Sequence, residues 1–314
     1  FFGGILTQNL GWRSVFLVNV PLGIAAYVLV LWKLKGEWAE AGKEKFDLAG
    51  ALIYAIMLVT LMYGFSILRE PAGAGMVAAG LIGLAVFIWW ELRAENPVLD
   101  MNLFRRNMVF SFSNLAALIN YSATFAVGFI LSLYLQKIRG FSPQYAGVIL
   151  IAQPAVMALF SPLAGRLSDK MESRVLSSLG MALTVAGLLP LILVQRGTPL
   201  IFIIASLVVI GLGLALFTSP NTHAIMGSVE RRYYGVASAT FGTMRLLGQA
   251  FSMGIVMLVF VMRVGNARIT PAFYPAFMEA VRGLFIIFSI LCFAGIFASL
   301  ARGKSVRRDE QGSQ

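Results

Sequence analysis

Five small or polar residues recur at helical spacing inside an apolar stretch, residues 236–262. Steps of four, three, four and three residues place them all on one face of a helix: Ser238, Gly242, Arg245, Gln249 and Ser252. Small residues and hydroxyls are typical of a contact between helices, to which we assign Gly242 and Ser252. A guanidinium deep in an apolar span costs at least ~2.5 kcal/mol unless water, a carboxylate or carbonyl groups meet it. We therefore interpret Arg245 as a residue that organises helix packing or a gate.

Polar residues also mark one face in each of two upstream apolar stretches, residues 108–135 and 144–164. Because an unpaired amide or hydroxyl is costly to bury in an apolar environment, these faces should lie against protein or line a cavity. For the second stretch, simple core packing is an equal alternative, since Met fills gaps anywhere. The candidate residues of a substrate cavity are Asn114, Asn120, Tyr121, Thr124, Gln153, Met157 and Gln249.

Other kinds of chemistry lack their sequence signatures. One His and one Cys are too few for the usual metal sites or disulfide frameworks. The nearest match to a phosphate-binding loop, residues 36–43, has the wrong spacing, and no serine lies between the glycines of a nucleophile elbow. We predict that the protein is not an enzyme and holds no cofactor or metal. All acidic residues lie in connections or at the ends of apolar stretches. If the protein couples transport to protons, the titrating carboxylate is therefore expected outside this sequence.

The composition indicates which elements hold these residues. Of the 314 residues, 59% are hydrophobic and 12% are charged, and the mean hydropathy is +0.82. Soluble domains carry roughly 45–50% apolar and about 25% charged residues, and a helix needs about 20 mostly apolar residues to cross a membrane. We predict an all-α polytopic membrane protein with nine full transmembrane helices: 15–32, 48–68, 75–92, 108–135, 144–164, 175–194, 200–220, 236–262 and 283–300.

The Lys and Arg residues give an expected orientation. When the connections between the nine stretches are assigned alternately to two sides, one side carries twice as many Lys and Arg residues as the other. The richer side should be cytoplasmic, and it includes the C-terminal tail, residues 302–314. The net charge of +11 therefore reports orientation, and no nucleic-acid partner is expected.

The spacing of charge also divides the chain into parts. The sequence starts at Phe1 without a Met, and the apolar run 1–10 resembles the end of a tenth span. We expect residues 1–34 to be the end of something larger, so that the chain is truncated at its N-terminus. Residues 35–107 hold two spans between charged connections, and residues 108–301 hold the remaining six.

The six spans of residues 108–301 fall into two groups of three. The third member of each group, residues 175–194 and 283–300, holds only a few Ser and Thr among apolar residues. Because a helix without polar side chains has no need of a protein or aqueous neighbour, we predict that these two helices are peripheral.

An ordered series of motifs is similar to those of a known transporter family. The motifs are Phe1-Phe2-Gly3-Gly4, Gly11-Trp12-Arg13-Ser14-Val15-Phe16, Asn19-Val20-Pro21-Leu22-Gly23, Pro97-Val98-Leu99-Asp100, Tyr134-Leu135-Gln136, Gly165-Arg166-Leu167-Ser168-Asp169-Lys170 and Arg231-Arg232-Tyr233-Tyr234-Gly235. In this order they resemble the fourteen-span drug:proton antiporters of the EmrB/QacA type in the major facilitator superfamily. The resemblance implies a major facilitator superfamily helix bundle: 1–34 ends the N-terminal bundle, 35–107 forms two linker transmembrane helices, 108–301 is the C-terminal six-helix bundle, and 302–314 is a cytoplasmic tail.

The same resemblance assigns roles to two charges. In that family an Asp at the position of Asp169 pairs with neighbouring helix ends and arginines to lock one gate state, which makes Asp169 and Arg174 candidate gating or structural charges. Residues 171–174 depart from the family's usual glycine and basic run. The alternative is that Ser173 caps a helix N-terminus and Asp169 is merely solvated.

The resemblance predicts a secondary active transporter that exports small amphipathic, often cationic substrates in exchange for protons by alternating access. Its partners would be protons, the lipid bilayer and the missing N-terminal half of the same protein. It would reside in the plasma membrane or a bacterial inner membrane, with a cytoplasmic C-terminus. Two alternatives stay open: export of an endogenous metabolite, lipid or siderophore on the same fold, and a nontransporting membrane sensor or scaffold.

Overall fold

The described part of the chain is built from helices. The computed structural model describes residues 11–33, 47–68, 70–94, 97, 101–263, 265 and 273–303, together with Gly3 and Leu6. The long helices are α3 (Asn19–Lys33), α4 (Leu48–Ser66), α5 (Pro71–Glu91), α7 (Met108–Thr124), α10 (Ala152–Lys170), α11 (Ser173–Leu191), α12 (Leu200–Gly227), α13 (Tyr234–Arg263) and α14 (Tyr274–Ala301). The short elements are α2 (Ser14–Leu17), α6 (Met101–Arg106), α8 (Val127–Leu133), η1 (Tyr134–Ile138), α9 (Pro143–Leu150) and η2 (Arg231–Tyr233).

Nine helical stretches within these residues are long and apolar enough to cross a membrane, which confirms the predicted spans and the all-α class. Some helices are longer than the apolar pattern predicted. α12 continues through Pro220 to Gly227, and α14 already begins at Tyr274. The expected end of a tenth span, residues 1–10, lies outside the described residues except for Gly3 and Leu6.

The span that begins with α7 is interrupted near its middle. α7 ends at Thr124 and α8 begins at Val127. In the break, the backbone N–H of Ala126 donates to Ser252 Oγ on α13 over 3.1 Å. A backbone donor freed inside a membrane needs a partner within the protein, so α13 stabilises the break. Ser252 therefore lies in a contact between helices, as predicted.

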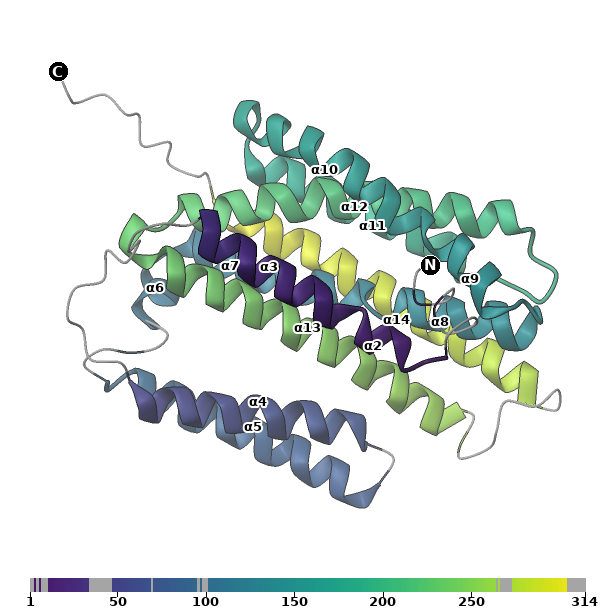
Figure 1. Cartoon of the computed structure of the whole chain (residues 1–314), viewed down its shortest axis with the longest axis horizontal. Helices are drawn as coiled ribbons and strands as arrows, with labels where there is room; N and C mark the ends of the chain where they lie inside the picture. Colours follow the sequence, from purple (N-terminus) through teal and green to yellow (C-terminus); the bar gives the residue numbers. More distant parts are fainter. Residues whose placement is uncertain are drawn as a thin grey trace.

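α7 and α10 to α14 run side by side as one bundle (Figure 1). α11 and α12 touch at glycines: a Cβ on Gly180 would lie 2.6 Å from the carbonyl oxygen of Gly213. Without side chains at these positions the two backbones come into direct contact. Aromatic side chains of α14 fill the core beside them, with Phe277, Phe285 and Phe288 fully buried.

The predicted peripheral position is wrong for α11. In its apolar part 56% of the residues are buried, as in the span that begins with α7, whereas the value for the span that contains α10 is 11%. α11 packs against α12 and α14, and its polar side chains Ser177, Ser178 and Thr184 are buried there. The sequence of a helix shows how polar it is. How many other helices surround it depends on the tertiary arrangement, which the sequence pattern of that helix does not give.

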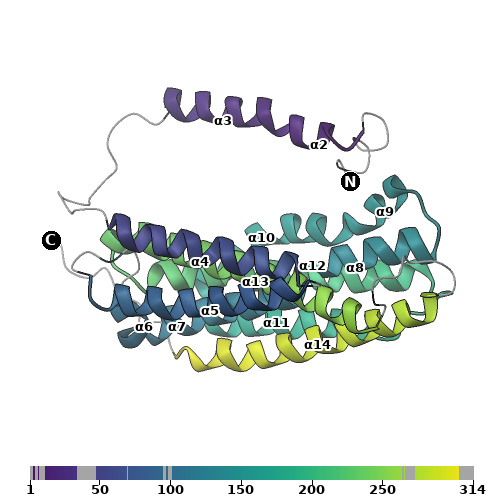
Figure 2. The ribbon, with the colours of Figure 1, turned by 90° about the horizontal axis from the view of Figure 1, so that it is seen from below.

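α4 and α5 form a hairpin, and α4 lies along α13 (Figures 1 and 2). The Tyr54 hydroxyl forms a hydrogen bond with Thr243 Oγ1 on α13. Further along, the rings of Phe65 and Phe251 meet edge to face with centroids 5.2 Å apart. The hairpin is therefore docked onto the same helix that carries Arg245.

α3 differs from the other long helices because it is fully exposed. Figure 2 shows α2 and α3 lying apart from the bundle. Every residue of α3 is exposed, although most of its 15 residues are apolar. An apolar helix surface of this size is stable in contact with lipid or with further protein.

Replacing Gly180 with alanine is expected to destabilise the bundle, because the added Cβ would meet backbone atoms of α12 that cannot move independently. Overpacking of this kind costs about 1–3 kcal/mol, which thermal unfolding of the purified protein in detergent would detect as a lower midpoint. Gly283→Ala is the matched control, since a Cβ there meets nothing within 4 Å and alanine favours a helix over glycine. Equal midpoints for the two variants would contradict the close α11–α12 contact.

Candidate functional site

A pocket of about 340 Å³ lies between the helices of the bundle. Its walls are mostly apolar and carry a few hydroxyl and amide groups, a combination typical of small-molecule sites. The lining residues come from α7 to α10, α12 and α13, with one from the α7–α8 break: Tyr121, Thr124, Phe125, Gly128, Leu150, Gln153, Pro154, Met157, Leu214, Thr218 and Gln249. The structure thus brings together the candidates Tyr121, Thr124, Gln153, Met157 and Gln249, which lie on three different helices.

A close contact between α7 and α13 positions part of this lining. A Cβ on Gly248 would lie 2.7 Å from the Leu118 carbonyl oxygen and 2.8 Å from Tyr121 Cβ, so the two helices could not approach as closely with a larger residue at Gly248. Gln249 follows directly and reaches the pocket beside Tyr121. The Tyr121 ring also packs against Phe241, with centroids 6.4 Å apart.

A second glycine brings α12 against α10. A Cβ on Gly211 would lie 2.6 Å from the Gln153 carbonyl oxygen, so α12 presses on α10 where Gln153 enters the pocket. Two turns further along α12, Thr218 Oγ1 is buried without a hydrogen-bond partner of acceptable geometry in the described structure, although the Tyr121 hydroxyl lies near it. The Thr218 hydroxyl is thus buried in the pocket lining beside Tyr121.

The structure does not bring Asn114 and Asn120 to the pocket. Both side chains are fully buried, with 0% exposure. Asn114 Nδ2 donates to the Phe110 carbonyl one turn earlier over 2.9 Å. In the described structure neither amide atom of Asn120 has a hydrogen-bond partner. The polar face predicted for α7 is therefore divided, with Tyr121 and Thr124 at the pocket and the two Asn side chains in the interior.

Arg245 lies on an exposed part of α13. The side chains of Ser238 and Arg245 are exposed, whereas Gln249 is half-buried. A Cβ on Gly242 would meet nothing within 4 Å, so the helix contact predicted for Gly242 is not made by the described residues. Arg245 is close enough to Tyr121 for an electrostatic interaction, and none of the ion pairs between described residues includes it.

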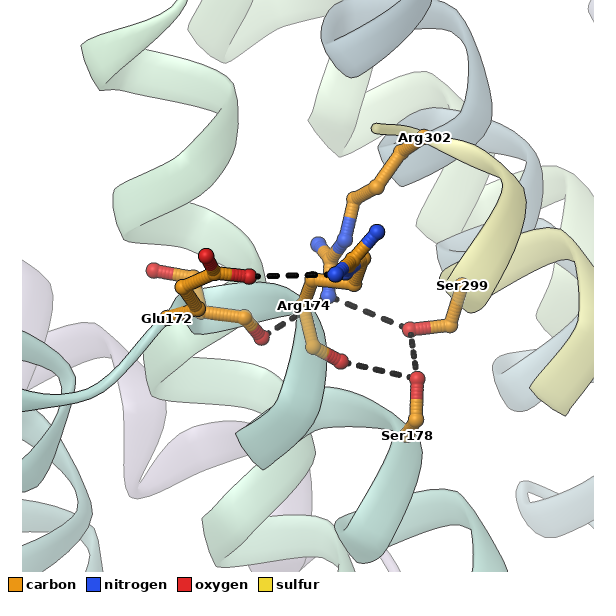
Figure 3. Close-up of polar contacts among 6 residues, drawn as sticks. Glu172, Arg174, Ser178, Ser299 and Arg302 are labelled. Atoms are coloured by element: carbon orange, nitrogen blue, oxygen red, sulfur yellow. Dashed lines mark hydrogen bonds and ion pairs between the residues drawn. The ribbon is translucent and has the colours of Figure 1, made fainter. Parts of the chain in front are cut away.

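A second polar cluster, at one end of the bundle, centres on Arg302, which follows α14 (Figure 3). This side chain is 1% exposed. It donates four hydrogen bonds: from Nη1 to Ser113 Oγ (3.1 Å) and Asn221 Oδ1 (3.0 Å), and from Nη2 to the Ser173 carbonyl (2.8 Å) and Ser299 Oγ (3.1 Å). Ser113 lies on α7, Asn221 on α12, Ser173 on α11 and Ser299 on α14. One guanidinium therefore joins four helices at what we call the Arg302 end of the bundle.

The acceptors of Arg302 are all neutral. Burial, and then the positive charge of Arg174, lower the pKa of Arg302 to about 10, so the guanidinium still carries its charge at neutral pH. Arg174 itself pairs with Glu172, with Nη2 and Oε2 3.3 Å apart (Figure 3). Because hydrogen bonds to a charged group are worth about 1.5–3 kcal/mol each, the four bonds offset the cost of burying the cation.

The sequence interpretation missed Arg302 by counting it among the residues of the C-terminal tail. The structure instead buries it inside the bundle. The signal that pointed to it was indirect. Ser113 and Asn221 lie in apolar segments whose buried polar groups need partners, and an arginine directly after the last span is long enough to reach them.

A second cavity, of about 350 Å³, lies at the Arg302 end. Its lining residues are Ser168, Asp169, Lys170, Met171, Glu172, Ser173 and His223. Asp169 is exposed. The capping role suggested for Ser173 is wrong, because Glu172 occupies the N-cap position of α11 and makes no side-chain cap bond, while the Ser173 carbonyl accepts from Arg302.

Comparison with known proteins identifies the fold family. Residues 113–313 match the family described as Major Facilitator Superfamily. The chain belongs to the major facilitator superfamily. It is accordingly a multi-pass membrane protein, and its matched region contains both the pocket and the Arg302 cluster.

Several relatives in the superfamily are named as transporters. "Riboflavin transporter RibZ" of Clostridioides difficile is 27% identical over 301 residues, 95% of this chain and 65% of that protein. "Uncharacterized transporter YebQ" of Escherichia coli is 34% identical over 255 residues, 79% of this chain and 55% of that protein. "Multidrug resistance protein Stp" of Mycobacterium tuberculosis is 28% identical over 265 residues, 81% and 48% of the two chains. The superfamily chain described here spans about half to two thirds of the length of these relatives.

The two kinds of polar position in this superfamily member should differ in chemical reactivity. In the full-length protein, a cysteine that replaces Tyr121 at the pocket should react with a small maleimide at least about tenfold faster than one that replaces Asn120, because a fully buried cysteine reacts only when helices open locally. The native Cys292 is buried, and the protein that contains Cys292 alone gives the background. Comparable rates at the two positions would contradict the division of α7 into a pocket face and an interior face.

Proposed function

We propose that the protein is a secondary active transporter that carries out proton-coupled multidrug efflux by alternating access. The observation that carries this proposal is the pocket of about 340 Å³ inside a bundle of membrane-spanning helices. A membrane helix gains nothing from amides and hydroxyls turned towards lipid, whereas a pocket that handles amphipathic solutes needs both apolar walls and hydrogen-bonding groups. The relative named as a multidrug resistance protein supports the substrate class.

The proposal includes the fourteen-span EmrB/QacA type. The nine spans then correspond to spans six to fourteen, and an N-terminal half of the same protein completes the transporter. Residues 1–34 belong to the N-terminal bundle, which gives the exposed surface of α3 a protein neighbour. Residues 35–107 are the linker pair with α4 and α5, and 108–301 form the C-terminal bundle. With the tail 302–314 in the cytoplasm of a plasma or bacterial inner membrane, the Arg302 end is the cytoplasmic end.

The pocket lining suits small amphipathic substrates. Gln153 on α10 and Gln249 on α13 supply amides that both donate and accept hydrogen bonds. Met157 supplies a flexible apolar contact that adapts to substrates of different shape. Tyr121 adds an aromatic face that accommodates a cationic group.

The charged residues are assigned to conformational roles. Arg245, exposed on α13 beside Tyr121, would contact a carboxylate or carbonyl groups of the N-terminal half and so control the gate between the two halves. Asp169 and Arg174 lie in or beside the connection between α10 and α11, where Arg174 pairs with Glu172. We assign them to the structure of that connection.

Proton coupling needs a carboxylate that titrates within the membrane. The acidic residues of the described segments lie at or near helix ends and in connections: Asp47, Glu70, Glu91, Asp169, Glu172, Glu230 and Glu279. Glu91 is buried, but it is the last residue of α5. The coupling carboxylate is therefore proposed to lie in the N-terminal half.

Dye transport by the full-length protein in everted membrane vesicles tests the proposal. We expect ethidium uptake that follows an imposed pH gradient and stops when a protonophore collapses it. Arg245→Gln should lower the initial rate at least about tenfold at equal expression, which corresponds to a loss of roughly 1.4 kcal/mol in the rate-limiting step. Arg263→Gln is the matched control on the same helix, because Arg263 forms an exposed ion pair with Glu279 at 3.6 Å, and such pairs contribute little.

Two outcomes would contradict the proposal. Absence of gradient-dependent flux for any cationic dye would exclude proton-coupled export of cationic drugs. An unchanged rate in Arg245→Gln would remove the gate role of Arg245. Absence of any flux in the wild type, for dyes and metabolites alike, would favour a sensor or scaffold.

A second candidate function is transport of an endogenous metabolite on the same fold. The relative named as a riboflavin transporter, which matches 95% of this chain, favours it. Lipids and siderophores belong to the same alternative. Competition separates the two functions: riboflavin or an extract of cellular metabolites should not slow ethidium uptake by a drug exporter, but should compete strongly in a metabolite transporter.

A further inference from the structure

A proline weakens α12 between the pocket and the Arg302 end. Pro220 lies inside the helix, where it cannot donate the usual hydrogen bond to the Leu216 carbonyl one turn earlier, and its ring opposes a straight helix. Residues 221–227 are therefore coupled to the rest of α12 less firmly than a continuous helix would allow. Their position must depend on contacts with other helices.

Asn221, the first residue after Pro220, makes those contacts with both ends of its side-chain amide. Its Nδ2 donates to the Ser113 carbonyl on α7 over 3.1 Å, and its Oδ1 accepts from Arg302 Nη1 over 3.0 Å. Arg302 Nη1 also donates to Ser113 Oγ. Asn221, Ser113 and Arg302 thus form a closed set of hydrogen bonds, and all three side chains are buried.

This set of bonds lies between the two cavities. On α12, Leu214 and Thr218 line the pocket, whereas His223, beyond Pro220, lines the cavity at the Arg302 end. On α7, Ser113 precedes the pocket residue Tyr121 by eight positions, roughly 12 Å at 1.5 Å per residue. Asn221 therefore lies on α12 between the residues that line the pocket and the residue that lines the cavity at the Arg302 end.

The attachment is strong enough to hold the segment and is also reversible. All acceptors of Arg302 are neutral. When the helices part, no carboxylate is left buried without its counter-charge, which makes breaking a buried ion pair so costly. The positive charge of Arg174 acts against Arg302 from nearby. A junction between a cation and neutral groups is weaker than a buried ion pair and can open during a conformational cycle.

We propose that Arg302 and Asn221 form a latch that holds the part of α12 after Pro220 against α7 and closes the pocket at the Arg302 end. When the latch opens, the pocket admits or releases substrate at that end; this role rests on the proposed transport function. Neither residue lines the pocket, so both are positioning residues. They act by setting where α12 lies relative to α7.

Accessibility of the pocket from the Arg302 end measures the latch without any substrate. The reporter is Met157→Cys, because Met157 lines the pocket from α10, outside the latch. The experiment uses the full-length protein with Cys292→Ser, in which the reporter is the single cysteine. A membrane-impermeant maleimide is added to everted vesicles, which expose the cytoplasmic side, and in parallel to intact cells, which expose the opposite side.

Arg302→Lys and Asn221→Ala should each raise the labelling rate of the reporter in everted vesicles at least about fivefold and lower it in intact cells, as expected for a shift between two states. Lysine keeps the positive charge but lacks the planar fork of donors, so this variant tests geometry and preserves charge. Arg232→Gln is the matched control at the same end of α12. Its ion pair with Glu230 is exposed, and labelling of the reporter in this variant should stay within about twofold of the rate with the unmutated latch.

Two results would overturn the latch. The first is unchanged labelling in both variants at normal membrane insertion. The second is an equal rise from both sides, which would show general loosening of the bundle. The double variant Arg302→Lys with Asn221→Ala should raise labelling by less than the two single effects combined, because both single variants remove the bond between Arg302 and Asn221, and fully additive effects would also contradict the proposal. If the labelling responds as expected while no dye is transported, the latch stands and the proposed function fails.

Discussion

The guanidinium of Arg302, buried where four helices meet, is the interaction on which the arrangement of the bundle depends. A cation removed from water must be met by hydrogen bonds, and here the acceptors come from α7, α11, α12 and α14 at 2.8–3.1 Å. These four bonds therefore fix the position of each helix along the bundle axis and its rotation about its own axis. The glycine contact of α11 with α12 lies along two of these helices, and Gly248 brings a further helix, α13, against α7.

The pocket occupies the part of the bundle where these restraints relax. The span of α7 breaks next to Thr124, and Pro220 interrupts the ladder of α12 close to Thr218. Both helices thus lack a regular backbone hydrogen bond near the pocket, while both are joined to Arg302 at the other end of the bundle. A bundle with a polar junction at one end and weakened helix hydrogen bonding beside its pocket is suited to opening at that end without losing its core. This combination connects the fold of the superfamily with the proposed alternating access.

The spans were predictable because the thickness of a membrane requires a fixed length of apolar helix, and all nine were confirmed among the described residues. Helical spacing also selected Thr124, Gln153 and Gln249, which share one pocket. The interior position of Asn120 was not predictable, because periodicity defines a face but does not name the helix opposite. Arg302 was missed for a related reason: a charge count places every arginine after a span in solvent, whereas burial depends on partners that are far away in the sequence.

Hydrogen exchange of α12 tests the central claim most directly. In the purified full-length protein, mass spectrometry would follow backbone amides of residues 221–227 in the wild type and in Arg302→Lys. The account predicts exchange at least about tenfold faster after Pro220 in the variant, with residues 203–214 unchanged, because only the first segment is held through Arg302. Uniform acceleration along α12, or no change after Pro220, would contradict it.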